Sequence, residues 1–441
     1  MADGAPLRRY DAIVVGSGPG GASVAHTLAR HGQRVLVLEQ GSAAPLRGTL
    51  TQMASIGAVP GKGAFIHRDA SLLVRGLTAG GTSTLNFATA AAPPLERFAA
   101  LGIDLAPALA ECRAELPIGP LPDGLLGPMA QRIMQGALAA GLPWHKLDKM
   151  IRPAICRSGC WRCVYGCPYG AKWTARDLLD EARLRGAHLL DQARATRVLL
   201  EQGRAIGVEY ERDGTLHSVR AGAVVLAGGG IGSPRLLHAS GLAPRSLPFF
   251  SDPVVAVMGT VDGLAGSDGG AAGAEVPMAA GMALEEEGLS FADLTLPKPM
   301  YQAFALQVGR VDRLFAHRRT LSIMVKIRDL AGGGIGPRWV DKTLQPEDRA
   351  RFRRGTALAR RILAEAGARH VFQSWHFAAH PGGALALGGG GPAAVDSDLR
   401  SAVPGLYVCD ASVLPAPWGL PPTLTLLALG KRLGRRLQDF M

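Results

Sequence analysis

Several short segments of the sequence have the hydrophobic pattern of β-strands. Residues 13–15, 35–38 and 223–226 are continuous runs of Ile, Val, Leu and Ala. Runs of this length that end at polar or glycine-rich segments are typical of buried strands. Two apolar stretches within residues 198–210, with Gln-Gly between them, predict a hairpin. The pattern also predicts a helix over residues 22–31, between the first two strands.

A different pattern appears in the second half of the chain. Leu321, Ile323, Val325 and Ile327 occupy every second position. This alternation predicts a half-buried strand. Residues 346–366 place apolar side chains at helical spacing among many arginines, which predicts an amphipathic helix.

A glycine motif follows the first predicted strand. Gly16, Gly18 and Gly21 form G-x-G-x-x-G, and Glu39 stands at the end of the second strand. In this context the glycines give a tight turn, a close approach to a pyrophosphate and close helix packing, and the acid binds a ribose hydroxyl. A Gly-rich turn with a purely structural role is the alternative. Because strand, helix and acid stand in the expected order, we expect a dinucleotide site. The Glu, and the position of the motif near the start of the sequence, favour FAD over NADP.

Four of the six cysteines are candidate metal ligands, namely Cys156, Cys160, Cys163 and Cys167. Closely spaced thiolates converge readily on one metal centre. The ending C-x2-C-x3-C-P is of the ferredoxin type and predicts a 4Fe-4S or 3Fe-4S cluster. Zinc and unligated thiols remain alternatives. Disulfides are disfavoured because the sequence shows no export signal.

Composition narrows the possible partners and location. The net charge of +12 indicates either a basic docking surface or a coding bias toward arginine, and the scattered basic residues favour the bias. No nucleic-acid motif is present, so we expect no nucleic-acid partner. No apolar run reaches the length of a spanning helix, so we expect no transmembrane segment. The first residues resemble folded protein rather than an export signal, which favours a cytoplasmic location.

Five segments together resemble the glucose–methanol–choline (GMC) family of FAD-dependent oxidoreductases. Besides the first glycine motif, these are residues 75–87, with Gly-Gly-Thr and a later Asn, residues 227–242, with Gly, Ser-Pro and Ser-Gly, the His-Pro-x-Gly segment at 380–383, and the Asp-x-Ser turn with the helix that follows. The candidates for holding FAD are Gly16, Gly18, Gly21, Glu39, Gly80, Gly81, Thr82, Asn86, Val198, Gly229, Asp410, Pro422 and Thr423.

The resemblance also implies the catalytic residues. His380 occupies the place of the catalytic histidine of the family. A second His or Asn is usual just ahead of the last helix, but Pro421 stands there and cannot bind a substrate oxygen through its side chain. His376 is the candidate substitute. The cysteine segment further resembles the cluster segment of bacterial FAD-dependent sugar dehydrogenases.

The family implies a two-part α/β architecture. We expect a Rossmann-like FAD-binding domain built from discontinuous segments, together with an α+β substrate domain that carries an antiparallel sheet. The expected FAD-binding segments are residues 8–90, 191–245 and 376–441, and the expected substrate-domain segments are 91–190 and 246–375, with the cysteine cluster at 151–176.

The implied reaction is oxidation of an alcohol by hydride transfer to flavin. The substrate would be an alcohol-type small molecule or a lipid. A cluster accepts one electron at a time, so a ferredoxin, cytochrome or quinone would take the electrons, which favours a dehydrogenase over an oxidase. Because the chain is short for the family, a partner subunit could complete the site. Two alternatives remain: a different flavin reaction (a desaturase or a light-driven lipid enzyme), or an FAD-holding electron-transfer subunit.

Overall fold

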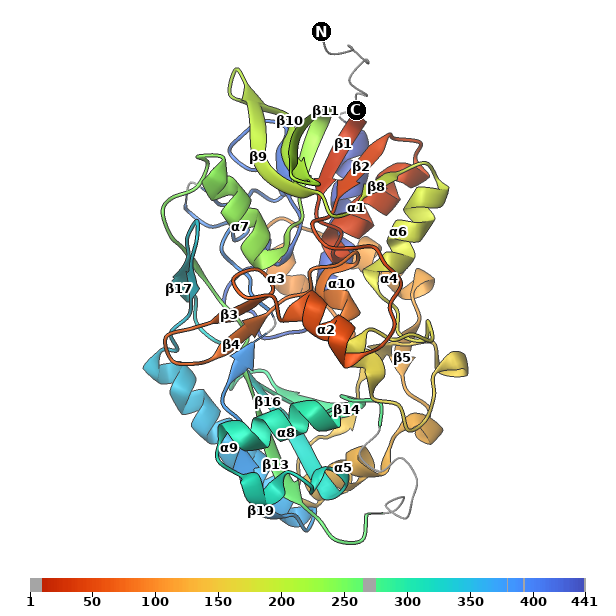
Figure 1. The fold of residues 1–441 in the computed structure, drawn as a ribbon, viewed down its shortest axis with the longest axis vertical. Helices are drawn as coiled ribbons and strands as arrows, with labels where there is room; N and C mark the ends of the chain where they lie inside the picture. The colour runs from red at the N-terminus through yellow and green to blue at the C-terminus, as the bar shows by residue number, and fades with distance from the viewer. Residues whose placement is uncertain (1–9, 265–274, 379, 392, 440–441) are drawn as a thin grey trace.

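The computed structural model describes residues 10–264, 275–378, 380–391 and 393–439. Residues 8 and 9 of the first expected segment, and 265–274 of the expected substrate domain, lie outside the described residues. A seven-stranded sheet and a nine-stranded sheet organise the described chain, one above the other in Figure 1. The α/β class expected from the sequence is confirmed.

The first sheet has the strand order β8-β2-β1-β11-β10-β9, and β21 pairs with the end of β11 on the side away from β1. β1 pairs in parallel with β2 and with the second half of β11, whose first half forms antiparallel hairpin pairs with β10. The three predicted buried strands and the predicted hairpin all lie in this sheet. Its strands are β1 (Tyr10–Val15), β2 (Val35–Leu38), β8 (His188–Leu190), β9 (Arg194–Glu201), β10 (Arg204–Arg212), β11 (Thr215–Leu226) and β21 (Leu406–Val408).

Helices pack on this sheet or on one another beside it. They are α1 (Pro19–Arg30), α4 (Ala106–Glu115), α6 (Ala175–Leu184), α7 (Gly229–Ala239) and α10 (Thr423–Gln438). α1 and α10 pack very closely because two residues of α10 have no side chain. A Cβ on Gly430 would lie 2.7 Å from the carbonyl oxygen of Gly20, and one on Gly434 would lie 2.6 Å from Cβ of Thr27.

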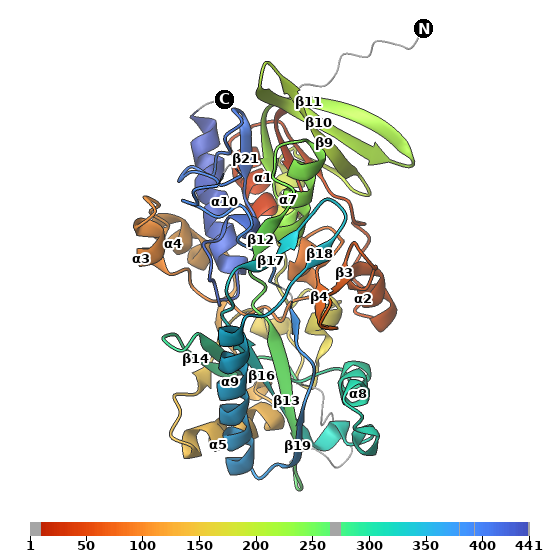
Figure 2. The ribbon, with the colours of Figure 1, turned by 90° about the vertical axis from the view of Figure 1, so that its left-hand side faces the viewer.

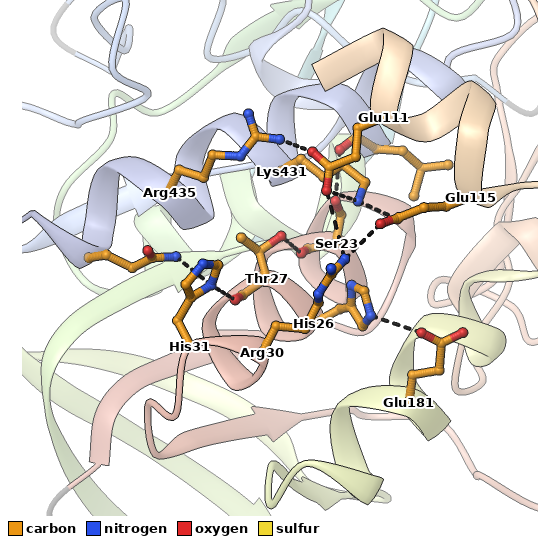
Figure 3. A network of polar contacts seen from close by, with 12 residues as sticks. Ser23, His26, Thr27, Arg30, His31, Glu111, Glu115, Glu181, Lys431 and Arg435 are labelled. Atoms are coloured by element: carbon orange, nitrogen blue, oxygen red, sulfur yellow. Dashed lines mark hydrogen bonds and ion pairs between the residues drawn. The ribbon is translucent and has the colours of Figure 1, made fainter. Parts of the chain in front are cut away.

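A polar network fixes α10 against α1 and α4 (Figure 3). Lys431 is almost fully buried, and its Nζ lies 2.7 Å from Glu111 and 2.5 Å from Glu115 of α4. Arg30 of α1 pairs with Glu115 over 2.6 Å, and Arg435 pairs with Glu111. A buried charge is tolerated only when it is well paired. The network therefore supports the close contact of the two helices.

The second sheet has the order β3-β4-β20-β13-β16-β15-β14-β6, and β19 also pairs with β13. Most of its pairs are antiparallel, as expected for the substrate domain. Its strands are β3 (Ala64–Ile66), β4 (Leu72–Val74), β6 (His145–Lys146), β13 (Val254–Thr260), β14 (Ala280–Leu284), β15 (Leu289–Asp293), β16 (Thr320–Ile327), β19 (Arg369–Gln373) and β20 (Phe377–Ala378).

Both faces of the second sheet are covered by helices. Figure 2 shows α5 (Pro128–Ala139) and α9 (Pro346–Glu365) on one side and α8 (Lys298–Gln307) on the other. The predicted helix at 346–366 is α9. The prediction of a half-buried strand at 321–327 is wrong, since every residue of β16 is buried. The reason is that α8 covers the face that alternation alone would leave to solvent.

Sheet membership differs from the expected domain segments at two places. Three strands of the second sheet come from the expected FAD-binding segments, namely β3, β4 and β20. Conversely, β8 pairs in the first sheet and α6 packs beside it, although both come from the expected substrate domain. The exact domain boundaries stay a prediction.

The remaining α-helices and strands are α2 (Leu50–Gly57), α3 (Leu95–Ala99), β5 (Ile118–Pro120), β7 (Asp148–Met150), β12 (Leu247–Phe249), β17 (Gly332–Ile335) and β18 (Val340–Asp341). Among the described helices, none combines the length and apolar character needed to cross a membrane.

Candidate active site

A deep cavity lies where the first sheet meets the start of three helices. Its walls include the ends of β1 and β2 and the first residues of α1, α7 and α10. The N-terminus of a helix carries free N–H groups and a partial positive charge. Three such ends around one space make it suited to a ligand with phosphate groups. The predicted site residues that line the cavity are Gly16, Gly18, Glu39, Gly81, Thr82, Asn86, Gly229, His380, Asp410, Pro422 and Thr423.

The three glycines of the first motif have different physical roles. Gly16 has φ +104, and a Cβ there would lie 2.3 Å from the carbonyl oxygen of Ala227. A Cβ on Gly21 would lie 2.2 Å from the carbonyl oxygen of Gly16, and Gly21 does not line the cavity. A Cβ on Gly18 would meet no protein atom within 4 Å, because this residue faces the cavity. Gly16 and Gly21 are therefore required for packing, whereas Gly18 leaves room for a ligand.

Glu39 is held at the end of β2 by three donors. Its Oε2 accepts from the N–H of Ser17 over 3.1 Å and from the Ser17 hydroxyl over 2.5 Å, and its Oε1 accepts from the N–H of Gly41 over 2.7 Å. Burial raises the pKa of Glu39, and the bonds from Ser17 oppose that rise. The Ser17 hydroxyl oxygen in turn accepts from the N–H of Gly80 over 3.1 Å. Ser17, which the sequence analysis did not identify, thus connects the first glycine motif to the second glycine segment, residues 75–87.

The second glycine segment closes one side of the cavity. It forms the 3-10 turn Gly81–Thr84, in which a Cβ on Gly81 would lie 3.0 Å from Cα of Gly18. Gly80 has φ +85 and supports this turn without lining the cavity. The Thr82 hydroxyl accepts from the N–H of Gly76 over 2.9 Å. Further along, Asn86 Nδ2 donates to Oγ1 of Thr423 over 3.3 Å, which connects this segment to the start of α10.

Arg75 is a cavity residue that sequence reasoning missed. Its Nε donates to the carbonyl oxygen of Lys62 over 2.7 Å, and its Nη1 lies 3.5 Å from that of Gly228. Burial lowers the pKa of Arg75 to about 10, and the carboxylates of Glu39 and Asp410 oppose that shift. The guanidinium stays charged at neutral pH and lines the cavity. Arg75 begins the Arg-Gly pair at the start of residues 75–87, and this position was the sequence signal that could have identified it.

Asp410 organises the far side of the cavity. Its Oδ2 accepts from the N–H of Gly229 over 2.9 Å and from the hydroxyl of Ser233 over 2.5 Å. Its Oδ1 accepts from the N–H and the hydroxyl of Ser412 over 2.8 and 2.5 Å. Burial raises the pKa of Asp410, while these bonds favour the charged form. One carboxylate thus fixes the start of α7 and the turn after β21.

Val198 is not a cavity residue. It is buried within β9, and its N–H donates to the hydroxyl of Ser240 over 2.9 Å. Ala193, Arg194 and Ala195, where β9 begins, line the cavity instead. The reason is the strand direction, which carries β9 away from the cavity after its first two residues.

The two predicted catalytic histidines lie in different places. His380 lines the cavity, and its Nδ1 is 3.8 Å from Oδ2 of Asp252. Burial lowers the pKa of His380, and the Asp252 carboxylate opposes that shift. His376 does not line the cavity, because its Nε2 lies 3.0 Å from Oδ2 of Asp69. His376 therefore does not occupy the position that Pro421 leaves, and the expected substitution is not seen.

The four cysteines of the predicted cluster lie near one another but not in metal-binding geometry. Burial raises the pKa of Cys156 to about 12, and the neighbouring thiols of Cys163, Cys160 and Cys167 add to the rise. Within the described residues, which include all four, no three His, Cys, Asp or Glu side chains are placed to hold a metal ion. As they stand, these residues do not fit a metal centre. The iron–sulfur cluster finds no support here and stays a prediction.

Lys172 connects the cysteine segment to the cavity wall. Its buried Nζ donates to the carbonyl oxygens of Cys163, Thr84 and Asn86 over 2.7, 2.7 and 2.9 Å. Burial lowers the pKa of Lys172 to about 8. The segment that carries the cysteines therefore supports the second glycine segment mechanically.

Two relatives are similar to this chain in sequence. An uncharacterized GMC-type oxidoreductase of Mycobacterium tuberculosis is 32% identical over 97% of this chain and 76% of its own length. A long-chain-alcohol oxidase of Arabidopsis thaliana is 26% identical over 82% of this chain and 54% of its own length.

Solved structures show the same fold. A pyridoxine 4-oxidase from Mesorbium loti has a TM-score of 0.73 at 19% identity and covers 98% of this chain and 99% of that one. A formate oxidase of Aspergillus oryzae, in a variant made to study FAD modification, has a TM-score of 0.75 at 15% identity and covers 98% of each chain.

Family comparison agrees with the site. Models described as GMC oxidoreductase match residues 10–257 and 337–430, the two stretches that contribute the cavity residues. The chain therefore belongs to the GMC oxidoreductase family and is an oxidoreductase of the class that acts on alcohol-type donors.

Proposed function

We propose that this protein binds FAD in the cavity and oxidises an alcohol, with His380 as the base that removes the hydroxyl proton. The observation that carries the proposal is that His380 lines the same cavity as the glycine cradle. A catalytic base must be placed beside the reacting group before its pKa matters. Membership of the GMC oxidoreductase family supports both the cofactor and the reaction class.

The cavity residues fit FAD. Gly18 leaves open the space that a pyrophosphate would fill, and the N-termini of α1 and α7 face that space. Arg75 adds a positive charge, and the Glu39 carboxylate is the natural acceptor for ribose hydroxyls. The structurally similar formate oxidase variant, made to study FAD modification, supports the same cofactor.

The protein residues supply a base and an electrostatic field for the reaction. When bound, FAD supplies the acceptor for the hydride that leaves the carbinol carbon. His380 is neutral at physiological pH because burial lowers its pKa, so its ring can accept the hydroxyl proton. The N-terminus of α10, at Thr423, lies at the cavity and stabilises negative charge there.

Two relatives support the proposed substrate class. The long-chain-alcohol oxidases of Arabidopsis thaliana favour an alcohol, including a lipid alcohol, over the desaturase, light-driven and electron-transfer alternatives. A one-electron carrier, an iron–sulfur relay, a partner subunit and a cytoplasmic location rest on sequence arguments alone and stay predictions.

Anaerobic stopped-flow reduction of FAD-loaded protein tests the proposal. 1-Dodecanol in detergent and glucose are the two probes, because a lipid alcohol and a sugar represent the two main alcohol types. His380→Ala should slow flavin reduction about 10²–10⁴-fold while FAD content stays unchanged. His376→Ala is the matched control and should retain nearly full activity, since that ring pairs with Asp69 outside the cavity. Equal rates in wild type and His380→Ala would reject the role of His380.

A further inference from the structure

Two buried polar atoms face each other behind the proposed base. Nδ1 of His380 and Oδ2 of Asp252 each lack a hydrogen-bond partner within the described part of the chain. They lie 3.8 Å apart, and the Asp252 side chain is completely buried. A buried carboxylate oxygen without a donor is costly, so such an atom in a native protein calls for an explanation.

Asp252 is held in place independently of His380. Its Oδ1 accepts from the N–H of Gly419 over 2.9 Å, in the loop that precedes α10. Its own N–H donates to Oδ1 of Asp329 over 2.8 Å, and Lys342 Nζ lies 2.9 Å from Asp329 Oδ2. Asp252 has φ +47, a left-handed conformation that few residues other than glycine, Asn and Asp adopt readily. The backbone and the first carboxylate oxygen thus fix the direction of the second.

The charged groups around this pair come from β16, from the loop after it and from the residue that follows β18. Lys326, on β16, pairs in register with Val254 of β13 and interacts with both Asp252 and His380. The Asp329 carboxylate, beyond Asp252, is compensated by Lys342. Arg328 packs its stem near Gly419. The negative charge that approaches His380 is therefore that of Asp252.

We infer that Asp252 is a positioning residue for His380: it accepts the Nδ1 proton and leaves Nε2 as the ring nitrogen that takes the hydroxyl proton. This inference rests on the proposed function. In the reaction, the alcohol O–H bond breaks, the proton moves to Nε2, and the imidazolium that forms is stabilised by the Asp252 carboxylate. Bound FAD would accept the hydride that leaves the carbinol carbon, so charge and electrons would balance. Distances of this kind are often long before substrate binds and shorten in the complex.

Asp252 also explains how the site works without the second polar side chain of the family. Pro421 stands where a His or Asn is usual, and Pro422 begins α10 beside the cavity. A proline side chain offers neither a donor nor an acceptor. We place the polar support for the base on Asp252, whose Oδ2 lies 3.8 Å from Nδ1 of His380.

Asp252→Asn is the sharpest test because it removes only the charge. Asn keeps an oxygen for the N–H of Gly419 and tolerates φ +47. An opposite charge at this distance raises a histidine pKa, so its loss should lower the pKa of His380 by about 1–3 pH units. Flavin reduction by 1-dodecanol should slow about 10- to 10³-fold, because the carboxylate no longer fixes the ring tautomer or stabilises the imidazolium. The acidic limb of the pH–rate profile should move to lower pH, because the pKa of His380 falls.

A measurement without substrate gives an independent readout. ¹⁵N NMR of histidine-labelled, FAD-loaded protein reports ring tautomer and pKa, and His380→Gln identifies the signal. We expect the Nδ1–H tautomer in the wild type and a mixed tautomer with a lower pKa in Asp252→Asn. An Nε2–H tautomer in the wild type would overturn the inference even if the variant failed to fold.

Asp329→Asn is the matched control. It removes the charge of a buried carboxylate that does not face the imidazole but keeps an oxygen for the N–H of Asp252, so the tautomer of His380 should stay the same. An unchanged pKa, tautomer and pH profile in Asp252→Asn would reject the role of Asp252. If His380→Ala were still slow, the proposed function would stand, whereas a fully active His380→Ala would reject the proposed function itself.

Discussion

The backbone N–H of Gly229 donates to Oδ2 of Asp410 over 2.9 Å, although 181 positions separate the two residues in the sequence. β11 and β21, the strands that precede them, are parallel neighbours, so their carboxyl ends meet at one edge of the sheet. This contact shows how the cavity is built. Segments from the start, middle and end of the chain are joined there by buried carboxylates and hydroxyls.

Gly18→Val should weaken FAD binding while leaving the fold intact. Gly18 has extended backbone that valine adopts, and a Cβ meets no protein atom within 4 Å, so only the ligand is obstructed. A steric cost of about 1–3 kcal/mol corresponds to a roughly 10- to 100-fold loss of FAD affinity. Equilibrium binding of FAD to apoprotein measures it. Gly21→Val is the contrast: it should lower stability first, because its Cβ collides with the Gly16 backbone. Full FAD affinity in Gly18→Val would contradict the assignment of the site.

The rate of flavin reduction should rise with pH and then level off. The neutral form of His380 is the active base, and burial lowers its pKa below the ordinary 6.5. The neutral form dominates above that pKa, so activity is lost as the pH falls through it. Values of kcat/KM between about pH 4.5 and 9 should give an apparent pKa below 6.5. An acidic limb centred well above 6.5 would show that another group is the base.

Replacement of single cysteines tests the sequence prediction of a cluster. If iron–sulfur is present, anaerobically purified protein shows broad visible absorption beyond the flavin bands, and Cys163→Ser removes it without loss of FAD. Because the four thiols do not form a metal group as placed, they would have to move together to bind one. Iron and zinc analysis beside the spectrum decides the question, with Cys112→Ser as control because that buried thiol lies on α4. Metal-free protein with full FAD content would contradict the prediction.

Gly430→Val should destabilise the protein. The added Cβ would lie 2.7 Å from the carbonyl oxygen of Gly20 and 2.6 Å from Cβ of Ser23, where two helices and a buried ion-pair network leave little room to move. Overpacking of this kind costs about 1–3 kcal/mol of unfolding free energy. Urea unfolding followed by circular dichroism measures it. Gly124→Ala is the control with free space around the new Cβ, and equal losses in both variants would argue against tight packing of α1 on α10.

The sequence by itself determined the strand–turn–helix unit and the place of Glu39. Continuous apolar runs, glycines and an acid at set spacing act through neighbouring residues, so their geometry follows from the local chain. The same holds for α9, whose period is visible within one segment. The antiparallel character of the second sheet followed from family resemblance, and the structure confirms it.

Only the tertiary structure decided which residues face the cavity. Gly18 and Gly21 look alike in the motif, but one faces a ligand space and the other a backbone carbonyl. The sequence favoured His380 and kept His376 as a candidate substitute, and only the structure places His376 outside the cavity, against Asp69 from a distant part of the chain. Asp252 gave no sequence signal because its direction depends on Gly419 and Asp329, both far from it in the chain. The direction of a side chain depends on long-range packing. A local sequence pattern does not determine which distant segment will pack against that side chain.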